Sequence, residues 1–234
     1  MTSGSVEVYR DWPDPAEIVG SLAVKFTLGY DGPLSATTQS DNRTKEKHDI
    51  RKALSFQLAQ LWAEEPALAS RMKKFKDFQT ATFVKDRIVL AGRSPKSKVR
   101  PHYSAYKFHL NGFCFVPLVT AHNNLFCELN VLLLRSGDPG HVVRRNGDLD
   151  NRIKTLFDAL RMPHDIQELG GVTPENDQPV FCLLEDDCLI TKITVATQRR
   201  LRQSGERTTW VNMQIGVNVV ARKITDYNRD YLTG

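Results

Sequence analysis

The chain has 234 residues, of which 41% are hydrophobic and 25% are charged, a composition typical of a folded domain rather than of a disordered chain. No apolar run approaches the ~20 residues that cross a bilayer, and the N-terminus has neither the basic nor the apolar region of a secretory signal, so we expect no membrane contact. The net charge of +5 is compatible with a polyanionic partner but does not require one. The 4 cysteines form no C-x-x-C pair, which argues against a zinc site or a disulfide framework and favours a cytoplasmic location.

In chain order, residues 1–20 predict an extended N-terminal arm, because they show little hydrophobic periodicity. Residues 22–28 predict a first strand, and the Gly-, Pro- and Ser-rich stretch after it predicts a loop. From Thr44, apolar residues recur at steps of three and four, which predicts a helix with the apolar positions Ile50, Leu54, Leu58, Leu61 and Trp62. A short second helix is expected to begin at Pro66, because proline suits the first turn of a helix.

Residues 85–107 are strongly basic and contain a single acid, Asp86. The glycine, prolines and serines in the middle of this segment predict a flexible loop there. Two interpretations stay open for this segment: a solvated loop, or an arm that contacts phosphates. Its cations are Lys85, Arg87, Arg93, Lys96, Lys98, Arg100 and Lys107.

Four further strands are predicted at 113–119, 125–134, 189–195 and 211–219. In the last of these, apolar and polar residues alternate, which is typical of a half-buried antiparallel strand. Along the chain, the predicted order is a strand, helices, paired strands, a helix and closing strands. This order indicates an α+β fold with a mixed β-sheet and helices packed on one face.

The first acidic cluster accompanies a predicted helix near residues 149–160, whose apolar stripe is Leu149, Ile153, Leu156, Phe157 and Leu160. Asp150 falls in the first turn, where a carboxylate can cap free N–H groups and oppose the positive end of the helix dipole. Lys154 follows four residues later, so its ammonium can lie beside Asp150. Helix capping explains one aspartate but leaves Asp148 without a role.

The second acidic cluster, Glu185, Asp186 and Asp187, directly precedes the strand at 189–195. Adjacent carboxylates repel one another, and a shared divalent cation would relieve that repulsion. Oxygen ligands without His or Cys favour Mg²⁺, or alternatively Mn²⁺, over zinc. Glu128 is a candidate further neighbour of the metal, or lies on an exposed face. The 6 histidines show no ligand spacing and are expected to be structural or on the surface.

Together the two clusters resemble the motif of the RusA-type Holliday junction resolvases. In this chain the motif reads Asp148-x-Asp150-Asn151-x-x-Lys154-x-x-x-Asp158-Ala159-Leu160, then Asp186-Asp187. The resemblance implies a RusA-like fold and a Mg²⁺-dependent endonuclease that acts as a homodimer on branched double-stranded DNA in recombination or repair. It also implies that Asp148, Asp150 and Asp187 are catalytic and bind the metal, that Asp186 is a further metal ligand, and that Lys154 is the catalytic lysine.

We expect one RusA-like nuclease domain at 21–222, with insertions at about 70–107 and 161–183, the arm at 1–20 and a C-terminal tail at 223–234. Cations that flank the acidic clusters in sequence, and those of the basic loop at 93–100, are expected to contact the DNA backbone. These are Arg144, Arg145, Arg93, Lys96, Lys98, Arg100, Arg199 and Arg200. Two alternatives stay open: a nucleic-acid-binding module that does not cut, and a nuclease for flaps, forks or ordinary duplex.

Overall fold

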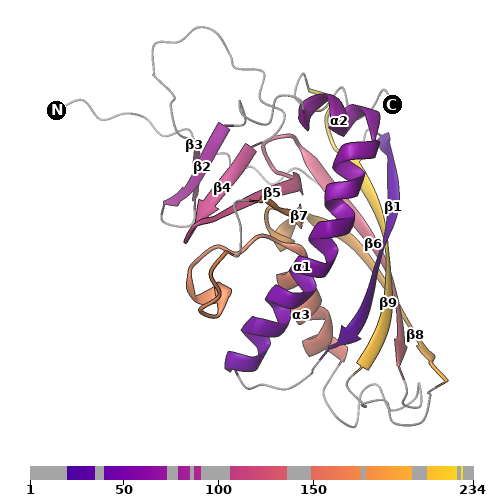
Figure 1. Ribbon diagram of the computed structural model, residues 1–234. Helices are drawn as coiled ribbons and strands as arrows, with labels where there is room; N and C mark the ends of the chain where they lie inside the picture. The colour runs from indigo at the N-terminus through magenta and orange to yellow at the C-terminus, as the bar shows by residue number, and fades with distance from the viewer. Residues whose placement is uncertain are drawn as a thin grey trace, which may run out of the picture.

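The computed structural model describes residues 20–34, 40–72, 79–84, 87–90, 106–135, 149–174, 178–201, 210–225 and 228. In these ranges the chain has the predicted α+β fold, and its strands form two mixed sheets (Figure 1). The first sheet has four strands, in the spatial order β1 (Gly20–Pro33), β9 (Trp210–Ala221), β6 (Leu125–Arg135) and β8 (Ile190–Arg199). Strand β9 is antiparallel to β1 and β6, whereas β6 is parallel to β8.

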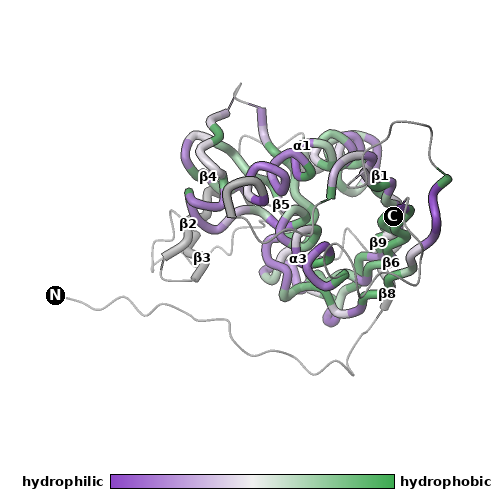
Figure 2. Tube along the Cα trace, turned by 90° about the horizontal axis from the view of Figure 1, so that it is seen from below, coloured by the Kyte–Doolittle hydropathy of each residue, from purple (hydrophilic) through white to green (hydrophobic). Residues whose placement is uncertain are grey.

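One face of the four-stranded sheet is apolar and the other is polar, as the alternation in β9 predicts. Val211, Met213 and Ile215 of β9 are buried, whereas Gln214 between them is exposed. The helices α1 (Ser40–Glu64) and α3 (Leu149–Leu160) lie on the same side of this sheet (Figure 2). They cover the apolar face, so the predicted packing of helices on one face is confirmed for this sheet.

The predicted apolar stripe of the first helix is buried in the main core, as shown by Leu54, Leu58 and Trp62. Helix α1 begins at Ser40, one turn earlier than the sequence suggested, and α2 (Pro66–Met72) begins at Pro66 as expected.

The second sheet has five strands, in the order β3 (Arg87–Leu90), β2 (Gln79–Val84), β4 (Tyr106–Leu110), β5 (Phe113–Val119) and β7 (Val180–Leu184). Strand β7, from the segment that the sequence suggests as an insertion, pairs in parallel with β5 and is buried along most of its length. The backbone N–H of Phe181 donates to Ser55 Oγ at 2.8 Å, which joins this strand to α1.

The strands β6 and β8 run in parallel. Helix α3, which lies between them in the sequence, runs in the opposite direction. At the start of α3, Arg152 donates to the carbonyl oxygen of Leu34, just beyond the end of β1. At the other end, the N–H of Met162 donates to the carbonyl oxygen of Leu184 at 3.0 Å, shortly before β8 begins. The last turn of α3 therefore lies near the start of β8, and its first turn lies at the opposite end of the sheet.

Two arginines of α1 hold α3 in place. Arg51, which is 2% exposed, donates to the carbonyl oxygens of Asp158 at 2.6 Å and Arg161 at 3.0 Å. These carbonyls have no partner within the helix, so the guanidinium caps its C-terminal end. Burial lowers the pKa of Arg51. Arg43 donates to the carbonyl oxygen of Asn151 at 3.3 Å, near the start of α3.

The first strand is longer than the sequence predicts, because residues 29–33 continue the pairing with β9 instead of forming a loop. The ring of Tyr30 crosses Gly32, where an added Cβ would lie 2.5 Å from the phenol oxygen, and that hydroxyl donates to the carbonyl oxygen of Pro33 at 2.9 Å. Among the described helices, none is long and apolar enough to cross a membrane.

Candidate metal and nucleic-acid site

One face of α3 carries three charged residues at intervals of four: Asp150, Lys154 and Asp158. Lys154 Nζ lies 3.1 Å from Asp150 Oδ2, and both side chains are 64% exposed. The predicted ion pair between these two residues is therefore confirmed. The opposite face of the helix buries Leu156, Ala159 and Leu160 against the core, which leaves the row facing solvent at its start.

The second acidic cluster leads into a short 3₁₀ helix, η4 (Asp187–Leu189), which lies directly before β8. Asp186 caps this helix by accepting from the N–H of Cys188 at 2.9 Å. Partial burial opposes ionisation of Asp186, but hydrogen bonds from Cys188 and the nearby His164 hold the pKa of Asp186 below its usual value. Burial and the negative charge of Asp186 together raise the pKa of Asp187. The two carboxylates thus repel each other, as expected for adjacent acids.

The η4 cluster meets the C-terminal end of α3. Asp158 and Arg161, in the last turn and just after it, are the residues of this region whose charges act on Asp187. Asp150 lies at the other end of the row, about 12 Å from Asp158 along the helix axis at 1.5 Å per residue. Lys154 lies midway between them. The structure thus brings the D-D pair to the helix that carries Asp150 and Lys154, but beside its last turn.

Asp158 belongs to an ionic network that sequence reasoning missed. Its carboxylate lies 2.5 Å from Lys47 Nζ and 3.4 Å from Arg161 Nη2. Arg161 also binds Glu168 through two hydrogen bonds of 2.8 and 2.9 Å. Burial opposes the charge of Glu168, yet the bonds from Arg161 lower the pKa of Glu168 overall. Lys47 is more than a hundred residues distant from Asp158 in sequence, so no local pattern could have revealed this contact.

His164 lies beside the D-D pair, with Nε2 at 3.4 Å from both Asp186 Oδ2 and the carbonyl oxygen of Glu185. Sequence spacing gave no reason to associate this histidine with the acidic cluster. Its position depends on the return of the chain from α3 to β7.

The predicted DNA-contacting residues fall into two groups. Arg144, Arg145 and the catalytic candidate Asp148 lie outside the described residues, as do Arg93, Lys96, Lys98 and Arg100. Arg199 and Arg200 are adjacent at the end of β8. Arg200 Nη1 lies 3.4 Å from Asp31 Oδ1, and the same carboxylate accepts from Trp210 and Asn212. The guanidinium of Arg200 is therefore already paired with the carboxylate of Asp31.

Carboxylate oxygens suit Mg²⁺ or Mn²⁺, and the mutual repulsion of Asp186 and Asp187 is the kind that a cation relieves. The donor chemistry therefore fits the expected metal. Within the described part of the chain, no group of three or more His, Cys, Asp or Glu side chains lies close enough together to hold a metal ion. Asp148 lies outside the described residues, and Asp150 and Asp187 lie at opposite ends of α3, so the structure does not bring these two predicted ligands of one ion together.

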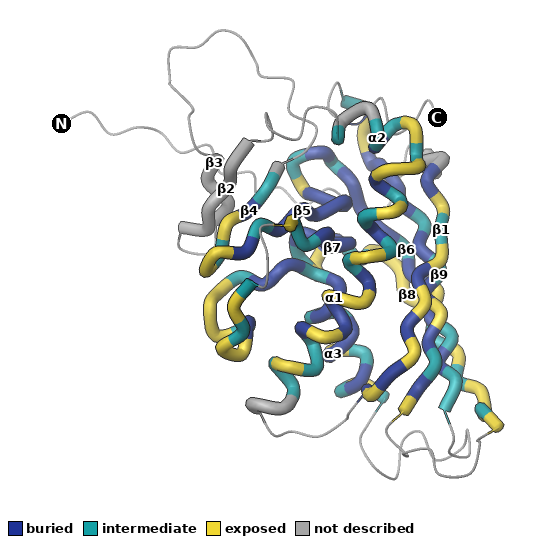
Figure 3. Tube along the Cα trace, viewed as in Figure 1, coloured by how far each residue is buried: buried dark blue, intermediate teal, exposed yellow. Residues whose placement is uncertain are grey.

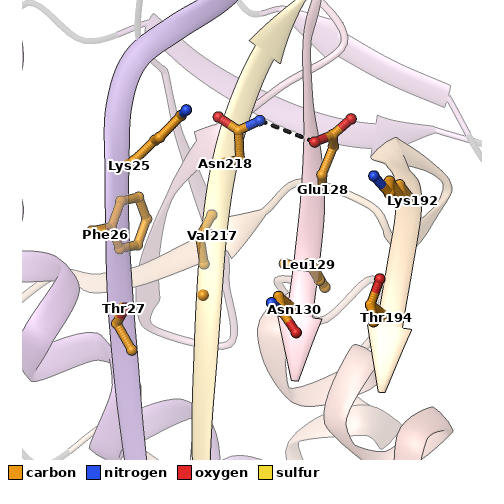
Figure 4. A pocket seen from close by; sticks show the side chains of 11 residues that line it. Lys25, Phe26, Thr27, Glu128, Leu129, Asn130, Lys192, Thr194, Val217 and Asn218 are labelled. Carbon is orange, nitrogen blue, oxygen red and sulfur yellow. Dashed lines mark hydrogen bonds between the residues drawn. The ribbon is translucent and has the colours of Figure 1, made fainter. Parts of the chain in front are cut away.

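A shallow pocket of about 450 Å³ opens on the polar face of the four-stranded sheet (Figure 4). Across its upper part, Lys25, Asn218, Glu128 and Lys192 occupy one register row of the four strands. Asn218 Nδ2 donates to Glu128 Oε2 at 3.0 Å. Because α3 covers the opposite face, Glu128 is separated by the sheet from Asp150 and Asp187, and it lies on an exposed face.

Comparisons with known proteins add no relative: no family model matches the chain, and neither a curated protein nor a solved structure is similar to it.

Proposed function

We propose that the protein is a Mg²⁺-dependent endonuclease that cuts branched DNA, as its resemblance to the RusA-type resolvases implies. The observation that supports this most directly is the exposed contact of Lys154 with Asp150 at 3.1 Å, on the helix whose last turn meets the Asp186–Asp187 pair. An exposed i,i+4 ion pair contributes little to stability, so folding does not require this pair and it is available for the chemistry that the resemblance implies.

In this proposal Asp148 and Asp150 hold the ion at the start of α3. Asp186 and Asp187, the other two ligands that the resemblance implies, lie beside the last turn of the helix, too far from Asp150 to share its ion. Bound Mg²⁺ would polarise the scissile phosphate and lower the pKa of a water nucleophile. Asp150 orients the Lys154 ammonium, whose charge can stabilise the negative charge that develops on the phosphate. Asp158, the remaining acid of the row, pairs with Lys47 and Arg161. These ion pairs suit a structural role for Asp158 at the end of the site.

The expected DNA contacts are those of the cations flanking the acids, because carboxylates alone would repel phosphates. Two copies of the chain would cut strands of opposite polarity. All 4 cysteines are free thiols, which fits the reducing cytoplasm in which such an enzyme would work.

The test is cleavage of labelled four-way junction, flap and linear duplex with Mg²⁺ or with EDTA. Paired nicks confined to the junction and abolished by EDTA support the proposal. Cleavage of flaps or duplex alone indicates another nuclease, and retention of DNA without any cutting indicates a binding module.

Asp150→Asn should abolish cutting but keep or tighten DNA binding, because it removes a negative charge near the phosphate. Asp49→Asn, the same change at an exposed position of α1, is the matched control. Wild-type cutting by Asp150→Asn would reject the site.

A further inference from the structure

The two edges of the four-stranded sheet differ in how their backbone groups are satisfied. At the β1 edge, the side chain of Gln57 from α1 accepts from the N–H of Gly29 at 2.8 Å and donates to its carbonyl oxygen at 2.7 Å. At Gly29 the side chain from the helix thus forms the two backbone hydrogen bonds that a neighbouring strand would form. Strand β8 forms the other edge, and within the described residues no strand or side chain satisfies its outer backbone groups.

The features that protect edge strands from pairing, Lys192 and a register irregularity at Thr191, are confined to the start of β8, and residues 193–198 carry none of them. The strand is 10 residues long, contains no proline, and has only Lys192 and Arg199 as charged residues. Ile193 is 39% exposed, and almost all of the strand is solvent-accessible (Figure 3). A long edge strand rich in β-branched residues and poor in charge is a template for pairing with another chain.

We propose that two copies of this chain associate through β8, as antiparallel neighbours about a two-fold axis that passes beside Thr194 and stands perpendicular to the sheet. The two four-stranded sheets then join into one continuous sheet. An axis in this direction keeps the helix-covered faces of both copies on the same side, so residues that face each other across the axis share a face.

The side chains of β8 are complementary to themselves in this register. Thr194 faces its own equivalent, and Ile193 faces Val195. Pairs of β-branched residues and of threonines stabilise antiparallel strands, and like charges directly opposite each other destabilise them. Lys192 lies opposite Ala196, so no charge of one copy faces a like charge of the other.

This arrangement depends on the edge of the strand alone and holds whether or not the chain cuts DNA. It places the α3 helices of both copies on one face of the joined sheet. Two copies of the Asp150–Lys154 pair then approach the same side of a ligand.

Disulfide cross-linking tests the register. Directly opposed residues of antiparallel strands have Cα atoms about 4.5–5.5 Å apart, within the range of a disulfide. The variant Thr194→Cys is made in a chain whose accessible Cys114 and Cys188 are replaced by serine, and Thr27→Cys on β1 is the matched control. Thr27 and Thr194 are both exposed, on the same polar face and in the same register row.

We expect mild oxidation to convert Thr194→Cys into a species of twice the 26.5 kDa chain mass, reversibly by a thiol reductant, and to leave Thr27→Cys monomeric on a denaturing gel. Absence of the Thr194→Cys cross-link, or an equal cross-link in Thr27→Cys, overturns the proposed interface.

Light scattering of the full-length chain provides the second measurement. The unmodified protein should be a dimer at micromolar concentration. Combining Ile193→Lys with Thr194→Lys, which puts cations opposite cations at the axis, should raise the dimer dissociation constant by at least about tenfold, with an unchanged circular dichroism spectrum. Thr27→Lys should leave the dimer intact. A monomeric wild type, or a dimer that the paired substitution does not weaken, contradicts the proposal.

Discussion

The guanidinium of Arg51 closes the C-terminal end of α3 by donating to the carbonyl oxygen of Asp158 at 2.6 Å. It connects the long helix to the helix that carries the candidate site, and it does so from a position that is 2% exposed. The position of the row Asp150, Lys154 and Asp158 therefore depends on Arg51, which is itself remote from the reacting groups.

Removal of this cap should lower the stability of the fold. Arg51→Ala leaves the carbonyl oxygens of Asp158 and Arg161 without their buried donor, so we expect the free energy of unfolding to fall by about 3 kcal/mol. Urea unfolding followed by the fluorescence of the buried Trp62 measures this loss. The exposed Lys45→Ala on the same helix is the control, and an equal effect of both changes would show that Arg51 is not a cap.

Lys154 should matter for catalysis and hardly at all for folding. Because its ion pair with Asp150 is exposed, Lys154→Met should change the free energy of unfolding by less than about 0.5 kcal/mol. Under the proposed function, junction cleavage should fall by at least about 100-fold. Lys52→Met on α1 should preserve both properties. A cleavage rate that Lys154→Met leaves unchanged would remove this lysine from the site.

The Arg161–Glu168 pair should contribute to acid unfolding. The pKa of Glu168 is lowered in the folded protein, so its stabilising charge is complete above the ordinary value of 4.5 and is lost as the pH falls through the lower folded value. Glu168→Gln should therefore reduce the loss of stability between about pH 5 and pH 3, as measured by urea titrations across that range. An identical pH profile in Glu168→Gln would show that the pair does not contribute.

Cys188 should react slowly for an exposed thiol. Partial burial and the carboxylate of Asp186, which accepts a hydrogen bond from the thiol, raise the pKa of Cys188. At pH 8 we expect alkylation at least about tenfold slower than that of an ordinary cysteine, because only the thiolate reacts. Asp186→Asn should accelerate the reaction, which peptide mapping can assign to this residue. Equal rates in both proteins would contradict the interaction.

Asp31 should limit the contribution of Arg200 to DNA binding. Asp31→Asn removes the carboxylate that lies 3.4 Å from Arg200 Nη1. If Arg200 then contacts a phosphate, affinity should rise and the slope of log K against log salt should steepen by up to about 0.9. Titrations at several salt concentrations measure this. In Asp31→Asn combined with Arg200→Ala the gain should disappear, and persistence of the gain would assign it to another group.

Sequence periodicity predicted the elements that have one buried face. The stripe on α3 and the alternation in β9 each depend on local spacing, and both elements lie where they were expected, within a few residues. Strands β2, β3, β4 and β7 and the end of β1 were missed. The strand character of β7 and of the end of β1 comes from pairing with distant segments rather than from their own pattern.

The candidate site, like the fold, was predictable only where it depends on local spacing. The Asp150–Lys154 contact follows from helical spacing and was predictable. The approach of Asp187 to the last turn of α3, rather than to the first, follows from the parallel direction of β6 and β8. Strand direction is a property of long-range pairing, so neither the partners of Asp158 nor the position of His164 could be read from nearby residues.

The contact of Gln57 with Gly29 has a consequence for the size of any assembly. A subunit with two open edges could add neighbours without limit and form a fibre. At Gly29 the β1 edge already has its backbone groups bonded by the subunit's own helix, which disfavours pairing of a further strand there and directs growth of this sheet to β8. Replacing Gln57 with a residue that leaves the Gly29 amide and carbonyl bare would remove this obstacle to a further strand at β1.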